Sequence, residues 1–170
     1  MKNQTRRDFI IRSSLGATGL ILLPGISTSQ TLSKQNQDKG PPIEISLVKE
    51  FVGAAHKDMA KVKTMLEVNP DLLNSVNNLG GWDWEDALGA AGHVGNPELA
   101  NFLLERGARM TICVAAMLGK TELVKSFILN FSFMKDAVGP HKISLMRHAK
   151  AGGEKSLEVI DYLKSLGLKE

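Results

Sequence analysis

Four histidines are the residues of this chain best suited to bind a metal ion or to move a proton near neutral pH. His56 and His93 each follow a pair of alanines, whereas His141 follows Gly139-Pro140 and precedes His148 by seven residues. The Gly-Pro pair predicts a loop at His141 rather than one helix shared with His148. His56 and His93 occupy positions where exposure to solvent is expected. Because metal ligands must converge in space and the sequence alone does not show such convergence, no metal ligand and no catalytic residue is assigned.

An aromatic and acidic loop supplies the second group of candidates. The stretch GGWDWEDA (80–87) holds both tryptophans of the chain, and exposed tryptophans are common anchors of protein interfaces. We expect Trp82 to be exposed above the permissive Gly80-Gly81 pair, and Asp86 to cap a helix that starts at Ala87. The alternative is that both tryptophans pack on neighbouring elements. The candidate binding residues of this loop are Trp82, Asp83, Trp84 and Glu85.

A locally basic stretch, GPHKISLMRHAKAGGE (139–154), is the third candidate region. Its cationic side chains could face an acidic partner or an anionic ligand. The alternative is a solvated terminal repeat, because the last unit of a repeat protein needs a polar outer face. The candidate binding residues of this region are His141, Lys142 and Arg147, together with His93 from the preceding part of the chain.

The candidates belong to helical hairpins that recur along the chain. In LGAAGHVGNPELANFLLERGA (88–108), small apolar residues predict a short helix and Gly95 predicts a turn. Asn96-Pro97-Glu98 is a capped helix start, and Gly107 is typical of a left-handed helix end. One such hairpin cannot bury its apolar face alone, so stacked copies are expected. Copies occur near 51–70, 111–128 and 143–167, with Asp58, Gly119 and Gly152 at the turn position.

This pattern resembles the ankyrin repeat. The positions of 86–108 that match are Leu88, Ala91, Gly95, Glu98, Leu103, Leu104, Glu105, Gly107 and Ala108. The resemblance implies an all-α, ankyrin-type helix-turn-helix solenoid of about four degenerate repeats over 47–170. The usual repeat start, T-P-L-H, is missing, and its histidine position holds Val52, Gly89, Cys113 and Met146. AAGHVG, AAMLG and GPHKISLMRHAKAGG also resemble a group of exported bacterial ankyrin-repeat proteins, which implies a fold but no particular activity.

The N-terminus predicts export. TRRDFII (5–11) contains the arginine pair Arg6 and Arg7, and LGATGLILLPGI (15–26) is an apolar run followed by small polar residues. This order is typical of a cleavable twin-arginine signal peptide over 1–29, with cleavage near Ser29. The apolar run is too short for a permanent membrane anchor. Residues 30–46 are predicted to be a flexible linker, and the product is expected in the periplasm or outside the cell.

Removal of this segment changes the charge of the protein. The whole chain has 21 basic and 18 acidic residues, of which four basic and one acidic lie in 1–29. The remainder has 17 of each, so nucleic acid is not an expected partner. No motif indicates a cofactor. We expect a monomeric, non-enzymatic module that binds a protein of unknown identity through its loops and inner helices. The alternative is a small-molecule or metal-ion binder, with an enzyme as a further possibility, that uses His93, His141 and Arg147.

Overall fold

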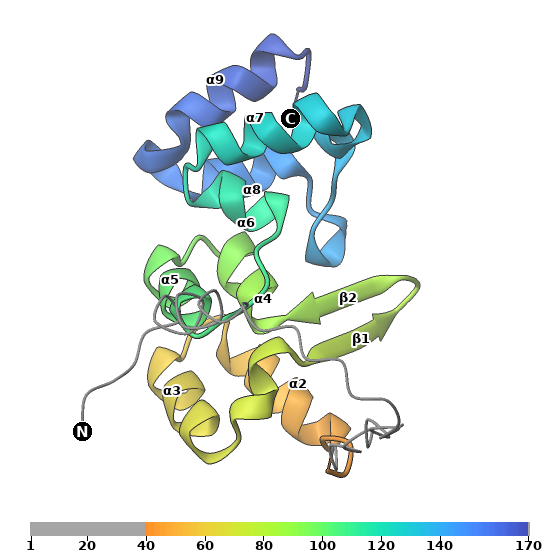
Figure 1. Cartoon of the computed structure of the whole chain (residues 1–170), viewed down its shortest axis with the longest axis vertical. Helices are drawn as coiled ribbons and strands as arrows, with labels where there is room; N and C mark the ends of the chain where they lie inside the picture. The colour runs from red at the N-terminus through yellow and green to blue at the C-terminus, as the bar shows by residue number, and fades with distance from the viewer. Residues whose placement is uncertain (1–39, 170) are drawn as a thin grey trace, which may run out of the picture. The chain divides into compact units, whose positions relative to one another are not determined.

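The computed structural model describes residues 40–169, which are mostly helical with a small two-stranded sheet (Figure 1). The α-helices are α2 (Ile45–Ala54), α3 (Met59–Val68), α4 (Ala87–His93), α5 (Pro97–Glu105), α6 (Ile112–Met117), α7 (Thr121–Asn130), α8 (Leu145–Ala151) and α9 (Leu157–Ser165). The strands are β1 (Val76–Gly80) and β2 (Asp83–Asp86). Short 3-10 turns are η1 (Pro70–Asn74), η2 (Ser132–Asp136), η3 (Pro140–Lys142) and η4 (Gly153–Ser156).

The structure describes the predicted repeat domain but not the predicted signal peptide. The predicted signal peptide, with Arg6 and Arg7, lies outside the described residues. Helix α2 begins at Ile45, two residues before the predicted start of the repeat domain at 47. Among the described residues, no helix is long and apolar enough to cross a membrane.

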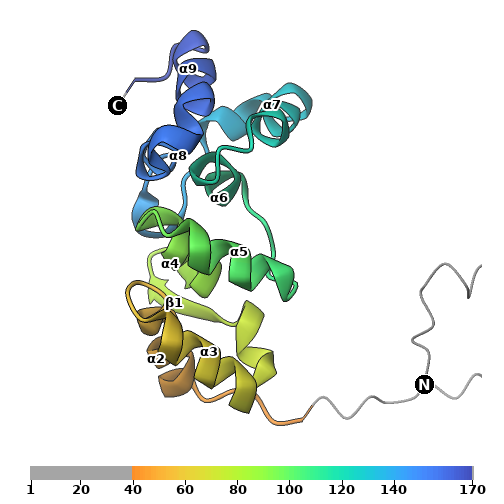
Figure 2. The same cartoon turned by 90° about the vertical axis from the view of Figure 1, so that its left-hand side faces the viewer.

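The helices form four antiparallel hairpins that follow one another along the chain (Figure 2). The first helix of each hairpin packs on the first helix of the next, so that α2 contacts α4, α4 contacts α6 and α6 contacts α8. The alanine pairs that mark these helices are buried, and their small side chains allow the close approach of neighbouring helices. The core therefore runs through the first helices, with leucine and valine side chains of the second helices packed beside them.

The caps that the sequence predicts fix where these helices begin and end. The side chain of Asp86 accepts the Gly89 N–H at the start of α4, and that of Asn96 accepts the Leu99 N–H at the start of α5. Gly107 follows α5 with a φ of +98°, which confirms the left-handed helix end. Gly95 and Gly119 also have positive φ values at the turn position, whereas Asp58, at the equivalent position of the first hairpin, has a φ of −130°.

The fourth hairpin departs from the predicted turn. Gly152 has a φ of −74°, an ordinary helical value, and Gly153 has the left-handed φ of +63°. The prediction of Gly152 as the turn glycine is therefore wrong by one residue. Gly152 is needed for a different reason, because a Cβ there would overlap the backbone oxygen of Met117. The glycine thus allows the end of α8 to lie against α6.

A β-hairpin projects before α4 and carries the aromatic and acidic loop. Strands β1 and β2 pair antiparallel, with Val76 opposite Asp86 and Asn78 opposite Trp84. Successive side chains of a strand point to opposite faces. Asp83 and Glu85 therefore share one face of β2, and Trp84 shares the other face with Asp86. This alternation places Glu85 and Trp84 in the two different regions described below, and Asp83 borders both of them.

Candidate metal centre

Three imidazoles meet at one buried carboxylate. Glu85 is 3% exposed, and its Oε1 lies 2.9 Å from Nε2 of His93, 3.2 Å from Nε2 of His141 and 3.3 Å from Nε2 of His56. One ligand atom from each of the four residues lies within 4.8 Å of every other. This is a compact group of three nitrogen donors and one oxygen donor.

The repetition of the hairpin places two of these histidines side by side. His56 lies just after α2 and His93 is the last residue of α4, each two residues before the turn position of its own hairpin. Since α2 packs on α4, equal positions on the two hairpins become neighbours. The ring centroids of His56 and His93 are 5.0 Å apart. The prediction that both face solvent is wrong for His93, whose side chain is 11% exposed.

His141 reaches the group from a short turn, η3, far along the chain. Its backbone N–H donates to Oδ1 of Asp83 at 2.8 Å, and its Nδ1 lies 3.5 Å from Oδ2 of the same carboxylate. Both His141 and Lys142 have left-handed backbones, with φ values of 57° and 56°. Non-glycine residues adopt this conformation rarely and at an energetic cost, and such strain is concentrated at functional sites. The loop prediction for His141 is confirmed.

Gly89 allows this turn to approach α4. A Cβ at Gly89 would lie 2.9 Å from Cγ of Pro140, closer than real Cβ atoms come to their neighbours. Gly89 occupies the position at which the ankyrin pattern has histidine. The absence of a side chain there has a physical reason in this protein, because Pro140 occupies the space and positions the next residue, His141.

The hydrogen bonds of His56 make the group incompatible with a neutral, metal-free state. Nδ1 of His56 lies 3.0 Å from the carbonyl oxygen of Val52, which can only accept, so Nδ1 carries the proton. In the neutral ring, Nε2 then presents a lone pair to the lone pairs of Glu85 Oε1. The contact becomes favourable when a cation lies between the two atoms or when His56 is protonated.

The donor set selects a class of metal. Imidazole nitrogen suits zinc, copper, iron and nickel, whereas calcium and magnesium require mainly oxygen ligands. Ligand atoms of a tetrahedral zinc ion lie about 3.3–3.6 Å apart, since each Zn–N or Zn–O bond is about 2.0–2.2 Å. The distances from Glu85 Oε1 to the three Nε2 atoms are 2.9–3.3 Å, whereas the most distant ligand atoms, which lie within 4.8 Å of each other, would have to approach by about 1 Å. Glu85 and His93 form the buried side of the centre, while the His56 and His141 side chains are 30% and 42% exposed.

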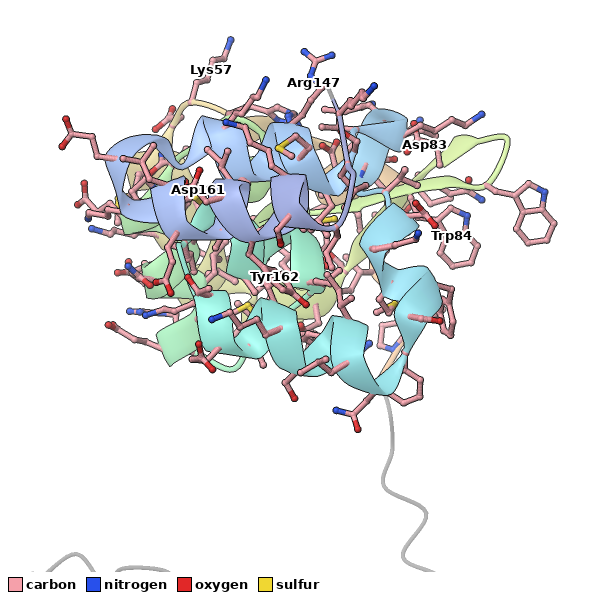
Figure 3. All side chains as sticks on the ribbon, turned by 90° about the horizontal axis from the view of Figure 1, so that it is seen from above. Lys57, Asp83, Trp84, Arg147, Asp161 and Tyr162 are labelled. Carbon is pink, nitrogen blue, oxygen red and sulfur yellow. The ribbon has the colours of Figure 1, made fainter. Side chains whose placement is uncertain are left out.

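The remaining predicted site residues lie outside this centre. Trp82 is 93% exposed and Trp84 is 58% exposed, which confirms the exposure expected of Trp82 and excludes the packed alternative for it. Lys142 is exposed beside His141, and Arg147 projects outward from α8 (Figure 3). His148 is completely buried and does not join His141.

The sequence assigned no metal ligand, left a metal-ion binder that uses His93, His141 and Arg147 as the alternative, and did not include His56 among the candidate site residues. The structure brings four potential ligands together, and two of them, His93 and His141, belong to that alternative. A signal for part of the centre was present, because His56 and His93 hold the same position in consecutive hairpins that pack together. The contribution of Glu85 follows only from the pairing of β1 with β2, and that of His141 from the contact of Pro140 with Gly89.

Comparisons of the chain with models of known protein families, with curated proteins and with solved structures give no match.

Proposed function

We propose that this protein binds a divalent transition-metal ion, with zinc as the reference case, through His56, Glu85, His93 and His141. The observation that carries the proposal is the convergence of three Nε2 atoms on one carboxylate oxygen that is almost fully buried. Groups that surround the four ligands also orient the histidine rings. The carbonyl of Val52 fixes the tautomer of His56, and the carboxylate of Asp83 faces Nδ1 of His141.

A positive charge at the centre, from a metal ion or from a single proton on His56, accounts for the group better than neutral side chains do. Three imidazoles share one oxygen atom, with ring centroids 5.0 Å apart for His56 and His93 and 5.1 Å apart for His93 and His141. If all three were protonated, three positive charges would lie together beside one negative charge. If all were neutral, the buried carboxylate would face at least one lone pair, and burial of a charge without compensation is costly. A divalent ion removes both difficulties.

We also infer the finer architecture and the location. An ankyrin-type solenoid is supported by the successive packing of α2, α4, α6 and α8, and by the β-hairpin that projects between repeats. Export through the twin-arginine route remains a proposal that rests on Arg6 and Arg7. That route transports folded proteins, so on this proposal the metal could be bound either before or after export.

A second function, recognition of a protein partner, is favoured by one observation. Trp82 is 93% exposed at the tip of the β-hairpin, and a large exposed aromatic side chain contributes more to an interface than to a monomer. Trp82→Ser should abolish capture of a periplasmic partner and leave the unfolding curve nearly unchanged. Loss of several degrees of thermal stability with the partner retained would contradict this role.

The metal proposal is tested with the full chain carrying a tag without histidine, stripped by a chelator and titrated with Zn²⁺ in a calorimeter. One ion should bind per chain. Cobalt(II) should give visible absorption bands of a nitrogen- and oxygen-ligated centre. His93→Ala and Glu85→Gln should each weaken Zn²⁺ binding by about a hundredfold or more, because four protein ligands define the site.

Matched controls separate loss of a ligand from a general change of charge. Glu154 is an exposed carboxylate and Lys57 adjoins His56, so Glu154→Gln and Lys57→Ala should leave Zn²⁺ binding unchanged. Binding that is equally strong in His93→Ala and in the original chain would overturn the proposal, and so would the absence of stoichiometric binding.

A further inference from the structure

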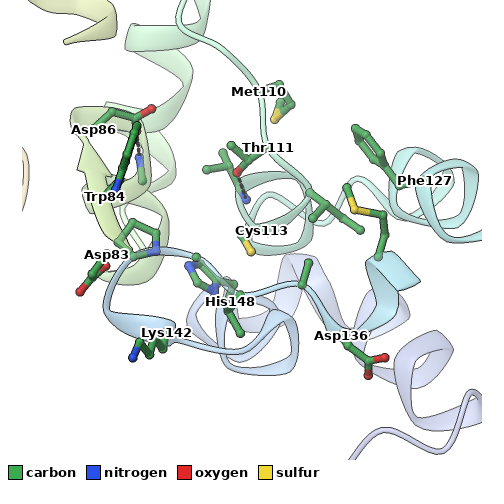
Figure 4. Close-up of a pocket in the computed structure, with 18 of the residues that line it drawn as sticks. Asp83, Trp84, Asp86, Met110, Thr111, Cys113, Phe127, Asp136, Lys142 and His148 are labelled. Carbon is green, nitrogen blue, oxygen red and sulfur yellow. Dashed lines mark hydrogen bonds between the residues drawn. The ribbon is translucent and has the colours of Figure 1, made fainter. Parts of the chain in front are cut away.

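A cavity of about 810 Å³ lies on the other face of β2. Trp84 and Asp86 line it, whereas none of the four residues of the metal centre does. The labelled side chains in Figure 4 show its walls, which come from β2, from the start of α6, from α7, from the loop that contains Asp136 and Lys142, and from α8. Cavities of about 300–1,000 Å³ are typical of small-molecule sites.

The walls are mostly apolar and partly exposed. Met110 and Phe127 line the cavity, and so do Trp84, Phe133 and Val138, which are 58%, 69% and 58% exposed. Solvent-exposed apolar side chains grouped around a concave surface are a feature of binding sites, since a folded monomer gains nothing from them. The body of a ligand in this cavity would therefore be apolar.

His148 adds one polar group to the cavity lining. Its side chain is completely buried, and its Nδ1–H donates to the carbonyl oxygen of Ser144 at 3.0 Å. Nε2 then carries a lone pair, and it has no hydrogen-bond partner among residues 40–169. Burial lowers the pKa of His148 below its ordinary value, so the ring is neutral and this lone pair is retained at neutral pH.

The backbone of Gly139 packs against the Nε2 edge of His148 and covers it, and no side chain stands between the two. A Cβ at Gly139 would lie 2.7 Å from Nε2, and both residues line the cavity. A buried acceptor without a partner is rare in proteins and requires a reason. A hydrogen-bond donor on a bound molecule is such a reason.

The charges around the cavity disfavour anions. Asp83, Asp86 and Asp136 line it, against the single ammonium group of Lys142. Two of these carboxylates already have partners, since Asp83 accepts the His141 N–H and Asp86 accepts the Gly89 N–H. The carboxylates therefore contribute a negative field at the edge rather than a pairing site for a cation.

We propose that this cavity binds an uncharged organic molecule with a ring-sized apolar body and one O–H or N–H group that donates to Nε2 of His148 once the Gly139 backbone shifts to expose that atom. The site shares no residue with the four ligands of the proposed metal ion, although Asp83 lines the cavity and also holds His141. If the organic probes do not bind, the metal proposal still stands. If Zn²⁺ does not bind, the proposal for the cavity still stands.

Three matched probes test the proposal on the full chain. 2-Naphthol has an apolar body and an O–H donor, 2-methoxynaphthalene has the same body without a donor, and 2-naphthoate carries a negative charge. The chain has two tryptophans, both of which line the cavity, so their indole N–H signals in an NMR titration report on this site. 2-Naphthol should shift both signals, and the ether should bind at least about tenfold more weakly because it leaves Nε2 unpaired. 2-Naphthoate should bind more weakly than 2-naphthol.

Two phenylalanines provide matched variants that are remote from the core. Phe133 lines the cavity, whereas the neighbouring Phe131 is 54% exposed and does not line it. Phe133→Ser should weaken 2-naphthol binding severalfold, and Phe131→Ser should leave it unchanged. Equal binding of 2-naphthol and its ether would overturn the role of His148. Unshifted indole signals, or equal effects of the two variants, would overturn the cavity as the site.

Discussion

The two faces of β2 support two different kinds of chemistry one residue apart. On one face, Glu85 is buried among three imidazoles, and every group there is polar and close to its neighbours. On the other face, Trp84 borders an open cavity whose lining is mostly apolar. The alternation of side chains along a strand separates Glu85 from Trp84, whereas Asp83 borders both regions. A short β-hairpin can therefore contribute to two sites without mixing their ligands.

The two regions also differ in what each one lacks. The histidine group has too many acceptors for the protons available to it, which a cation would correct. The cavity has an acceptor without a donor at His148, which an O–H or N–H group would correct. Both depend on the segment 139–142, which supplies His141 to one region and Gly139, Pro140 and Lys142 to the other.

The largest effect should come from the metal itself. A ligand that binds only the folded state at a thousandfold excess over its dissociation constant stabilises that state by about 4 kcal/mol. Zn²⁺ at that excess should raise the free energy of unfolding by this amount, as measured by urea denaturation, and a chelator should reverse the change. Mg²⁺ should have no effect because the donor set is rich in nitrogen. His93→Ala should not respond to Zn²⁺, and an unfolding curve indifferent to Zn²⁺ in the original chain would contradict a site in the folded state.

A smaller effect is expected at Asp83, which holds His141 without being counted among the ligands. Asp83→Asn keeps the shape of the side chain but removes the charge that faces Nδ1 of His141. Loss of such a second-shell partner costs about 10–100-fold in metal affinity, so Zn²⁺ binding should weaken within this range. The matched control is Asp136→Asn, which changes an exposed carboxylate outside the metal centre. Equal Zn²⁺ affinity in both variants would show that Asp83 does not position His141.

Local signals in the sequence predicted most of the helices but not the two regions that they create. The caps at Asp86 and Asn96 and the left-handed Gly107 were readable because each acts within one turn of chain. The metal centre joins residues 56 and 141, which no local rule connects. The need for a glycine at position 152 has the same origin, since it depends on the backbone oxygen of Met117, far along the chain.

The smallest effect is expected from two glycine-to-alanine substitutions. Together they distinguish a change in Zn²⁺ affinity from a change in the stability of the fold. Gly89 and Gly53 both lie inside helices, but a Cβ at Gly53 meets nothing within 4 Å, whereas a Cβ at Gly89 meets Pro140 at 2.9 Å. Gly53→Ala should stabilise the protein by about 0.5–1 kcal/mol, because alanine favours a helix over glycine, and it should leave Zn²⁺ affinity unchanged. Gly89→Ala gains the same helix preference but displaces η3, and His141 moves with it.

For Gly89→Ala we therefore expect Zn²⁺ affinity to fall by about tenfold, a change of about 1.4 kcal/mol in binding free energy, while the metal-free protein remains folded. Calorimetry gives the affinity and urea denaturation gives the stability, so the two quantities are measured independently. If both variants bind Zn²⁺ equally well, the turn at 140–142 tolerates the extra methyl group and Gly89 does not set the position of His141. A loss confined to Gly89→Ala would show that the missing side chain in α4 is part of how this protein builds its metal centre.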